Sequence, residues 1–474
     1  MLDLLLAPIR LLVDRVGLAL AALGLVSTRR ARRVSDLAWP RIVTGVARMS
    51  QSTADVAMVG TALGTAAIAG VGFATPFWLL AFMVGGGIAG ATLSLVSQRF
   101  GAGRRDEIGG AVTMSAVLAL AATVPLAVGI GALAEPLVGL IGSGGEAVAY
   151  GAAYLRVAAL GMPFAALNLV ASRALVGAGD ARTPMLVRTG GAVLNVALNA
   201  WLIFGAGIGV VGAALGTVAS SAAVTAAFAW ALTRGRLPGV GPIPVRLRRA
   251  AFRWEGATAR QLTEIATPLA LTNLVQTGGQ FPLMAVVSLY GPETVAAFVV
   301  ALRIRDLMNT PGWGFGLASS SLVGQSLGTG REGEAGAYAH DALRFAVAVY
   351  VLAAGAVLVL AGPISGLFVS DPAVLPTTVG LVRVTCLSVV LWGIVTGAKG
   401  PLRASGDTRW PLYGHVLALL AFVLPVAYLG AVTPLGVTGL ALALLLETGV
   451  PAAVTYYRFR SDAWKLVSRA YRPA

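Results

Sequence analysis

Four polar side chains within long apolar stretches are the first candidates for chemistry: Asp55, Asn195, Asn199 and Thr217. An ionisable group in a bilayer costs from about 2.5 kcal/mol upward, so an acid in such a stretch is a functional candidate. A carboxylate with neutral oxygen ligands suits a hard cation such as Na⁺, and a carboxylate held away from water suits a proton. The four residues therefore predict a site for cation or proton coupling, and we expect no other metal site.

Spacing places these four side chains at one depth. Asp55 lies about seven residues, or roughly 10 Å at 1.5 Å per residue, inside the end of its apolar stretch near Thr61. Asn199 and Thr217 lie about as far inside their own stretches, and Asn195 is one helical turn from Asn199 on the same face. Interhelical hydrogen bonding is the alternative for the asparagines and the threonine, because it is common in membrane bundles. For Asp55 the membrane cost favours a functional role.

The composition indicates which solvent surrounds these residues. Of the 474 residues, 57% are hydrophobic and 12% are charged, and the mean hydropathy is +0.82. A soluble domain carries roughly 25% charged residues, so the chain is predicted to be an all-α integral membrane protein. The net charge of +15 comes from basic residues between apolar runs rather than from a basic face, which argues against a nucleic-acid partner. The single Cys386 excludes a disulfide framework and a cysteine-based zinc site.

The chain divides into twelve apolar stretches of spanning length, since a transmembrane helix needs about 20 residues. They begin near Leu37, Ile68, Ile108, Glu146, Thr183, Val210, Gln261, Val295, Tyr338, Val374, Trp410 and Gly436. We expect an amphipathic cytoplasmic segment over 1–36, a first six-helix lobe over 37–233, a basic connector over 234–260, a second lobe over 261–457 and a basic tail over 458–474.

Arginine and lysine collect at alternate hairpins, and the other hairpins carry none. Because positive residues favour the cytoplasmic side, both termini and the connector are predicted to be cytoplasmic. The arginine-rich, alanine-rich composition suggests a prokaryotic source. The expected location is therefore the cytoplasmic (inner) membrane, with several passes.

The two lobes repeat each other at an offset of 227 residues. Leu95, Gln98, Gly101 and Gly103 recur as Leu322, Gln325, Gly328 and Gly330, and Gly179, Asp180, Arg182 and Pro184 recur as Gly406, Asp407, Arg409 and Pro411. An even number of spans per repeat preserves orientation, so we expect a parallel repeat about an axis along the membrane normal. The positions equivalent to the four candidate residues are apolar: Pro282, Phe422, Val426 and Leu444. The coupling chemistry is therefore predicted in the first lobe alone.

The order and duplication of these motifs resemble the multidrug and toxic compound extrusion (MATE) family, from about Leu37 to Tyr457. The resemblance rests on Asp55 with Val59 and Gly60, Gln98 with Gly101 and Gly103, Tyr154 to Arg156, Gly177 to Asp180, and Asn195 through Gly205 to Gly212. It implies twelve helices in two lobes and, in the archaeal and DNA-damage-inducible branch, coupling through a first-helix Asp and an Asn, an Asp and a Thr from helices five and six. Asp55, Asn195, Asn199 and Thr217 occupy those positions. Asn199 departs from the branch, which usually has a second carboxylate there, so one proton on Asp55 is favoured over Na⁺.

Further polar residues are candidates for a substrate cavity: Gln51, Arg48, Asn168, Asn273, Gln276 and Gln280. Arg48 lies two turns before Asp55, and it either faces the same interior or extends toward the cytoplasm. Arg303 and Asp306 are three residues apart and are expected to form a structural pair. The role of Glu447 stays open.

The resulting hypothesis is a secondary active exporter that works by alternating access. The resemblance implies amphipathic, often cationic organic substrates that leave in exchange for H⁺ or Na⁺. We expect no other cofactor, membrane lipids and small organic compounds as partners, and a monomer. A flippase for lipid-linked or phospholipid substrates is the alternative, supported by Arg48. A membrane enzyme is disfavoured, because no Walker spacing, paired carboxylates or His/Asp cluster is present.

Overall fold

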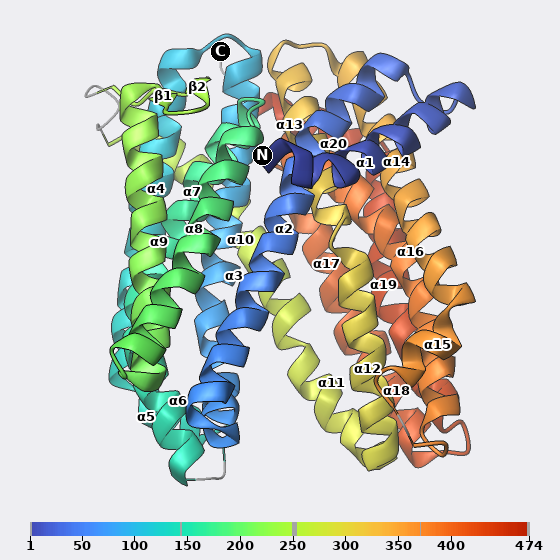
Figure 1. The fold of residues 1–474 in the computed structure, drawn as a ribbon. Helices are drawn as coiled ribbons and strands as arrows, with labels where there is room; N and C mark the ends of the chain where they lie inside the picture. The colour runs from blue at the N-terminus through green and yellow to red at the C-terminus, as the bar shows by residue number, and fades with distance from the viewer. Residues whose placement is uncertain (1, 143–144, 249–253, 370, 472–474) are drawn as a thin grey trace. The chain divides into compact units, whose positions relative to one another are not determined.

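The computed structural model describes residues 2–142, 145–248, 254–369 and 371–471, in which helices dominate (Figure 1). The strands in this described part are β1 (Arg236–Leu237) and β2 (Gly241–Pro242), which pair antiparallel with Arg236 opposite Pro242. The predicted helical class is therefore confirmed, with this short hairpin as an addition.

Nine helices of the described chain are long and apolar enough to cross a membrane. They are Thr65–Gly101, Arg105–Ala132, Gly145–Gly177, Arg182–Gly205, Gly209–Arg234, Glu332–Val359, Leu375–Ser405, Arg409–Val432 and Val437–Arg460. These match nine of the twelve predicted spans. The other three, expected near Leu37, Gln261 and Val295, fall on shorter or more polar helices, so the count of twelve stays a prediction.

The described chain forms two compact units. Helices α2 (Thr28–Leu63) and α10 (Gly256–Gly278) each begin in one unit and end in the other. Unit 1 comprises Met1–Ile42 and Leu271–Ala474, and unit 2 comprises Val43–Ala270.

Unit 2 is a helical bundle whose elements appear in blue to yellow-green in Figure 1. They are α3 (Thr65–Gly101), α4 (Arg105–Ala132), α5 (Ala134–Gly139), α6 (Gly145–Ala158), η1 (Ala159–Gly161), α7 (Met162–Gly177), α8 (Arg182–Ala200), the π-helical turn η2 (Trp201–Gly205) and α9 (Gly209–Arg234). Small residues let these helices approach closely, as is usual in membranes. A Cβ on Gly70 of α3 would lie 2.4 Å from the carbonyl oxygen of Ala147.

Part of the predicted connector packs onto unit 2. Ile243 and Val245 are buried in one cluster with Phe228 and Leu232 of α9, and the Leu247 amide donates to the Leu232 carbonyl at 2.8 Å. The apolar residues on either side of the hairpin explain this packing. They follow no helical or strand period, so the sequence pattern did not predict the contact. The part of the connector over 249–253 lies outside the described residues.

Unit 1 contains α1 (Leu2–Ala22), α11 (Gln280–Val287), η4 (Ser288–Tyr290), α12 (Pro292–Asn309), α13 (Gly312–Gly328), α14 (Glu332–Val359), α15 (Ala361–Gly366), α16 (Leu375–Ser405), α17 (Arg409–Leu417), η5 (Ala418–Val423), α18 (Leu424–Val432), α19 (Val437–Arg460) and α20 (Ala463–Arg469). Its core includes Phe298, Tyr350 and Val389, all nearly fully buried. The start of α2 is tied to α14, because Arg30 Nε lies 2.6 Å from Asp341 Oδ2.

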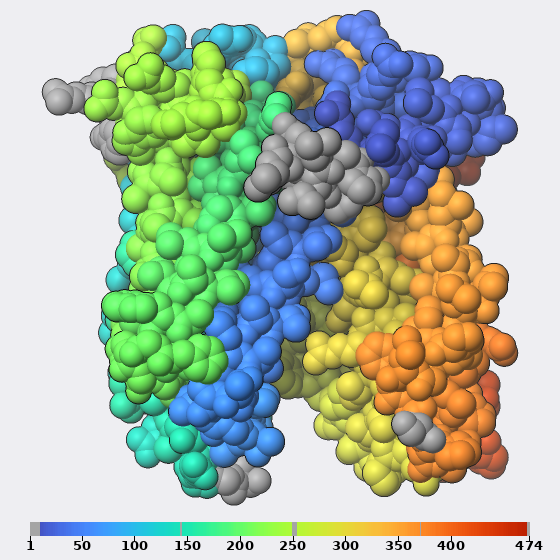
Figure 2. Space-filling view, in the orientation of Figure 1, coloured from blue at the N-terminus to red at the C-terminus, as the bar shows by residue number. Residues whose placement is uncertain are grey.

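The outer surface of unit 2 is apolar along α8 and η2. Val193, Trp201 and Phe204 are exposed over 68%, 63% and 54% of their surface, and Figure 2 shows this helical face in green. Large apolar side chains exposed together in this way are typical of a lipid-facing surface.

Candidate functional site

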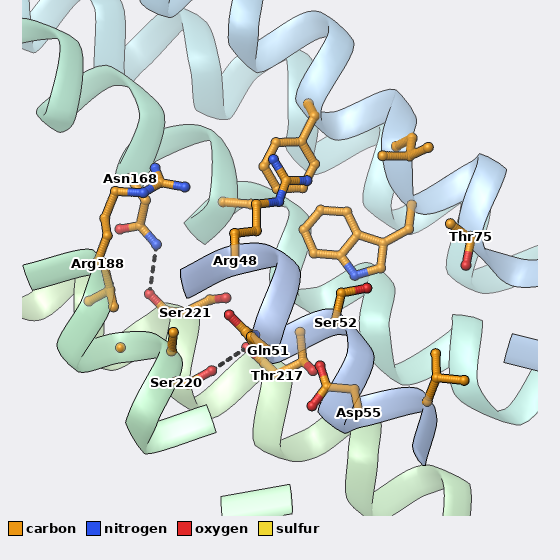
Figure 3. Close-up of a pocket in the computed structure, with 18 of the residues that line it drawn as sticks. Arg48, Gln51, Ser52, Asp55, Thr75, Asn168, Arg188, Thr217, Ser220 and Ser221 are labelled. Atoms are coloured by element: carbon orange, nitrogen blue, oxygen red, sulfur yellow. Dashed lines mark hydrogen bonds between the residues drawn. The ribbon is translucent and has the colours of Figure 1, made fainter. Parts of the chain in front are cut away.

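A cavity of about 270 Å³ lies within unit 2 (Figure 3). Helices α2, α3, α6, α7, α8 and α9 supply its walls. Its polar lining comprises Thr44, Arg48, Gln51, Ser52, Asp55, Thr75, Tyr154, Asn168, Arg188, Thr217, Ser220 and Ser221. Two of the four predicted coupling residues, Asp55 and Thr217, therefore face this cavity.

The four predicted coupling residues form one hydrogen-bonded chain behind and along the cavity wall. Asn199 Nδ2 donates to Asp55 Oδ1 at 2.7 Å and lies 3.3 Å from Asn195 Oδ1. Asn195 Nδ2 in turn lies 3.2 Å from Thr217 Oγ1 and 3.3 Å from Ser220 Oγ. Both asparagines are fully buried, so the chain links the exposed edge of Asp55 to the interior of the bundle.

Asn199 occupies a place that only a glycine opposite it allows. A Cβ on Gly216 of α9 would lie 1.9 Å from Asn199 Oδ1. The same oxygen has no hydrogen-bond partner among the residues described. A buried amide oxygen without a donor is costly, and here it lies in the residue that bonds Asp55. It can therefore accept a hydrogen bond from a protonated acid or coordinate a hard cation.

Asn168, a predicted cavity residue, also lies in the wall. Its Nδ2 donates to the Ser221 carbonyl at 3.0 Å, and its Oδ1 accepts from Thr225 Oγ1 at 2.9 Å. These bonds join α7 to α9. Gln51 lines the same cavity from α2, one turn before Asp55.

Arg48 lines the cavity, and its guanidinium lies 4.3 Å from the ring centroid of Phe82. The interior orientation is thus the one the structure adopts. Arg188 of α8 lines the cavity too, and it was not among the residues predicted for the cavity. Its spacing of seven residues, two helical turns, from Asn195 was the signal that could have identified it.

The second-lobe candidates belong to unit 1 and are described within it. Gln276 Nε2 lies 2.7 Å from Nε2 of the buried His415. Asn273 is half-buried in α10, and Gln280 is exposed at the start of α11. Their part in substrate binding stays a prediction.

The expected pairing of Arg303 with Asp306 stays a prediction, and the ion pair that the structure shows in this region joins two other residues. Arg305 NH1 of α12 lies 2.6 Å from Glu447 Oε2 of α19, and no bridge between Arg303 and Asp306 occurs among the described residues. Helix spacing favours local pairs, but only packing decides which arginine meets another helix. This contact also places Glu447, whose role the sequence left open.

No group of three or more His, Cys, Asp or Glu side chains that could hold a metal ion occurs in the described part of the chain.

Comparison with known proteins identifies the family. The MatE family model matches residues 40–201 and 268–429. The chain is 29% identical to the multidrug resistance protein MdtK of Pectobacterium atrosepticum, covering 93% of this chain and 98% of that one. It is 25% identical to the FAD transporter of Shewanella oneidensis, covering 92% and 95%. The crystal structure of MATE in the bent conformation has the same fold, with a TM-score of 0.85 at 22% identity over 93% of this chain and 97% of that one. The chain belongs to the MatE family of integral membrane transporters.

Proposed function

We propose that this transporter is a secondary active multidrug exporter that moves amphipathic organic compounds outward in exchange for H⁺ through Asp55, by alternating access. The observation that carries the proposal is the bond from Asn199 to Asp55 at the edge of a polar cavity. A carboxylate in a membrane span is costly. The Asn199 amide bonded to this one has an Oδ1 atom with no hydrogen-bond partner in the described part of the chain. Such an arrangement has two protonation states with different hydrogen bonds.

The proton step follows from the donor and acceptor inventory. With Asp55 ionised, Asn199 Nδ2 donates to it. A protonated Asp55 would instead donate to an acceptor, and rotation of the Asn199 amide would present its Oδ1. That rotation would place Nδ2 beside Gly216 and change the link to Asn195. We propose that this exchange of hydrogen bonds lets α2 repack and shrink the cavity.

Na⁺ is the alternative coupling ion. Asp55, Asn199 Oδ1 and Thr217 Oγ1 offer oxygen ligands, which hard cations prefer. Asp55 is the one carboxylate among the described residues that line the cavity. A single negative charge is neutralised by one proton as well as by one Na⁺.

We further propose that the transporter consists of two parallel copies of one six-helix unit, with twelve spans in all. Helix bounds support this: α4 and α14 begin and end 227 residues apart, as do α5 and α15. Gly103 and Gly330 both have positive φ, at 75° and 76°, where glycine is favoured. The family model also matches twice. We place the termini in the cytoplasm, the chain in the inner membrane, and the working unit as a monomer.

The names of relatives support drug export and widen the substrate range. One relative is named a multidrug resistance protein and another a FAD transporter. FAD carries phosphates and is therefore an organic anion, so the name of this relative describes transport of an organic anion. Arg48 in the cavity lining is the residue on which the flippase alternative rests, and the names of the relatives do not support a flippase better than an exporter.

Dye uptake into energised inverted vesicles tests the proposal. We expect gradient-driven uptake by the wild type and its loss in Asp55→Asn, with a pH gradient and a Na⁺ gradient applied separately to identify the ion. Glu293→Gln, at the start of α12 and in the other unit, is the control and should retain uptake. Full gradient-driven transport by Asp55→Asn would refute the coupling role.

A further inference from the structure

The cavity of unit 2 carries an excess of positive charge. Of the described residues that line it, Arg48 and Arg188 are positive, Asp55 is the one carboxylate, and the others are neutral. The excess remains when Asp55 is ionised and grows when Asp55 is protonated. Guanidinium groups that line a cavity bind anionic groups through charge-assisted hydrogen bonds.

The two arginines lie apart from the coupling residues along their helices. Arg48 precedes Asp55 by seven residues, and Arg188 precedes Asn195 by seven, which is roughly 10 Å at 1.5 Å per residue. Figure 3 shows both arginine side chains reaching toward the end of the cavity away from Asp55. Arg48 has no carboxylate partner among the described residues, and its guanidinium lies against the ring of Phe82.

An aromatic wall adjoins this positive end. The rings of Trp78 and Phe82 stack at 4.8 Å with an interplanar angle of 22°, and both line the cavity with Tyr154. Planar apolar faces of this kind favour an aromatic ligand body. Arg48 stacks on Phe82 at 4.3 Å, so cationic and aromatic surfaces are adjacent.

Resting on the proposed transport function, we propose that this cavity binds a small aromatic organic anion. The anionic group, a carboxylate, sulfonate or phosphate, lies between Arg48 and Arg188, and its planar body lies against Trp78 and Phe82. A volume of about 270 Å³ is near the lower end of ligand pockets, roughly 300–1,000 Å³, and suits a body of one to three rings. This substrate class differs from the cationic one that the family resemblance implied.

The charge distribution separates binding from coupling. Arginine binds carboxylates and phosphates through paired donors, so each arginine contributes to anion affinity. Asp55 contributes none and repels an anion when ionised. Asp55→Asn should therefore retain or strengthen anion binding while it abolishes gradient-driven export.

Calorimetric titration of the full-length protein in nanodiscs tests the inference with three naphthalene probes of matched shape: naphthoate (anion), naphthamide (neutral) and naphthylmethylammonium (cation). We expect naphthoate to bind roughly tenfold or more tighter than the cation, and Arg48→Gln or Arg188→Gln to weaken it by a similar factor. Arg48→Lys should restore part of the affinity. Arg156→Gln is the matched control, because Arg156 is exposed on α6 and does not line the cavity.

Equal binding of the cation and the anion, or naphthoate affinity that neither cavity arginine changes, would overturn the inference. The titration measures binding without a gradient, so its result is independent of the vesicle assay for gradient-driven export. Dye export with no naphthoate binding would refute the anion site alone, and naphthoate binding with no export under any gradient would refute the exporter alone.

Lipid headgroups also carry anionic phosphates. A second set of titrations therefore tests whether the bound anion is a soluble compound or a lipid. The titration is repeated in nanodiscs of phosphatidylcholine with and without phosphatidylglycerol. Arginine-dependent naphthoate binding that phosphatidylglycerol leaves unchanged supports a soluble anion. Competition by phosphatidylglycerol, lost in Arg188→Gln, supports the anion site and assigns it to a lipid phosphate.

Discussion

Replacing Gly216 by alanine tests the coupling network without removing any of its polar groups. The added Cβ would lie 1.9 Å from Asn199 Oδ1 and 3.2 Å from the backbone nitrogen of Asn199. The side chain must move, which disturbs the bonds from its Nδ2 to Asp55 at 2.7 Å and to Asn195 at 3.3 Å. A hydrogen bond to a charged group contributes about 1.5–3 kcal/mol, and overpacking adds about 1–3 kcal/mol.

We therefore expect Gly216→Ala to lower the thermal midpoint of the purified protein and to reduce gradient-driven export severely. The assays are size-exclusion chromatography after heating and uptake into inverted vesicles. Gly190→Ala in α8 is the control: no heavy atom lies within 4 Å of its added Cβ. Alanine is the better helix former by about 1 kcal/mol, so this control should be neutral or stabilising.

A double mutant assigns the effect to the contact. In an Asn199→Ala background the clash partner is absent, so adding Gly216→Ala should cost much less stability than it does in the wild type. The reasoning would be refuted if Gly216→Ala behaved like Gly190→Ala, or if its cost were the same in both backgrounds.

Two further predictions concern packing within each unit. Arg305→Gln should destabilise unit 1, because it leaves Glu447 without its partner at 2.6 Å; loss of one buried partner costs about 3–5 kcal/mol. The half-exposed position of Glu447 places the expected cost at the lower part of that range. Arg303→Gln should change the thermal midpoint little, and an equal effect of both variants would contradict the pairing. In unit 2, Gly70→Ala should destabilise by about 1–3 kcal/mol, because its Cβ would meet the Ala147 carbonyl oxygen at 2.4 Å. A Cβ on Gly72 would meet no described atom within 4 Å beyond its own helix backbone, so Gly72→Ala should be tolerated. Comparable heat denaturation of Gly70→Ala and Gly72→Ala would oppose this reasoning.

Much of the fold was predictable because a bilayer imposes simple length and polarity rules. Nine predicted spans coincide with long apolar helices. The connector packs on α9 through Ile243 and Val245. Local periodicity carried no information about that contact, because it joins segments through tertiary burial.

The candidates for ion coupling could be named from the sequence. Asp55 is conspicuous because a carboxylate is costly in an apolar span, and helical spacing placed Asn195 and Asn199 on one face. Their hydrogen-bonded chain in the structure follows that expectation.

Tertiary structure alone decided which charged groups meet. Arg188 lines the cavity, although it was not among the predicted cavity residues. Arg305, rather than its neighbour Arg303, reaches Glu447 across 142 residues of chain. Helical spacing describes one helix face at a time, whereas an ion pair or a cavity wall depends on how faces of different helices pack against each other.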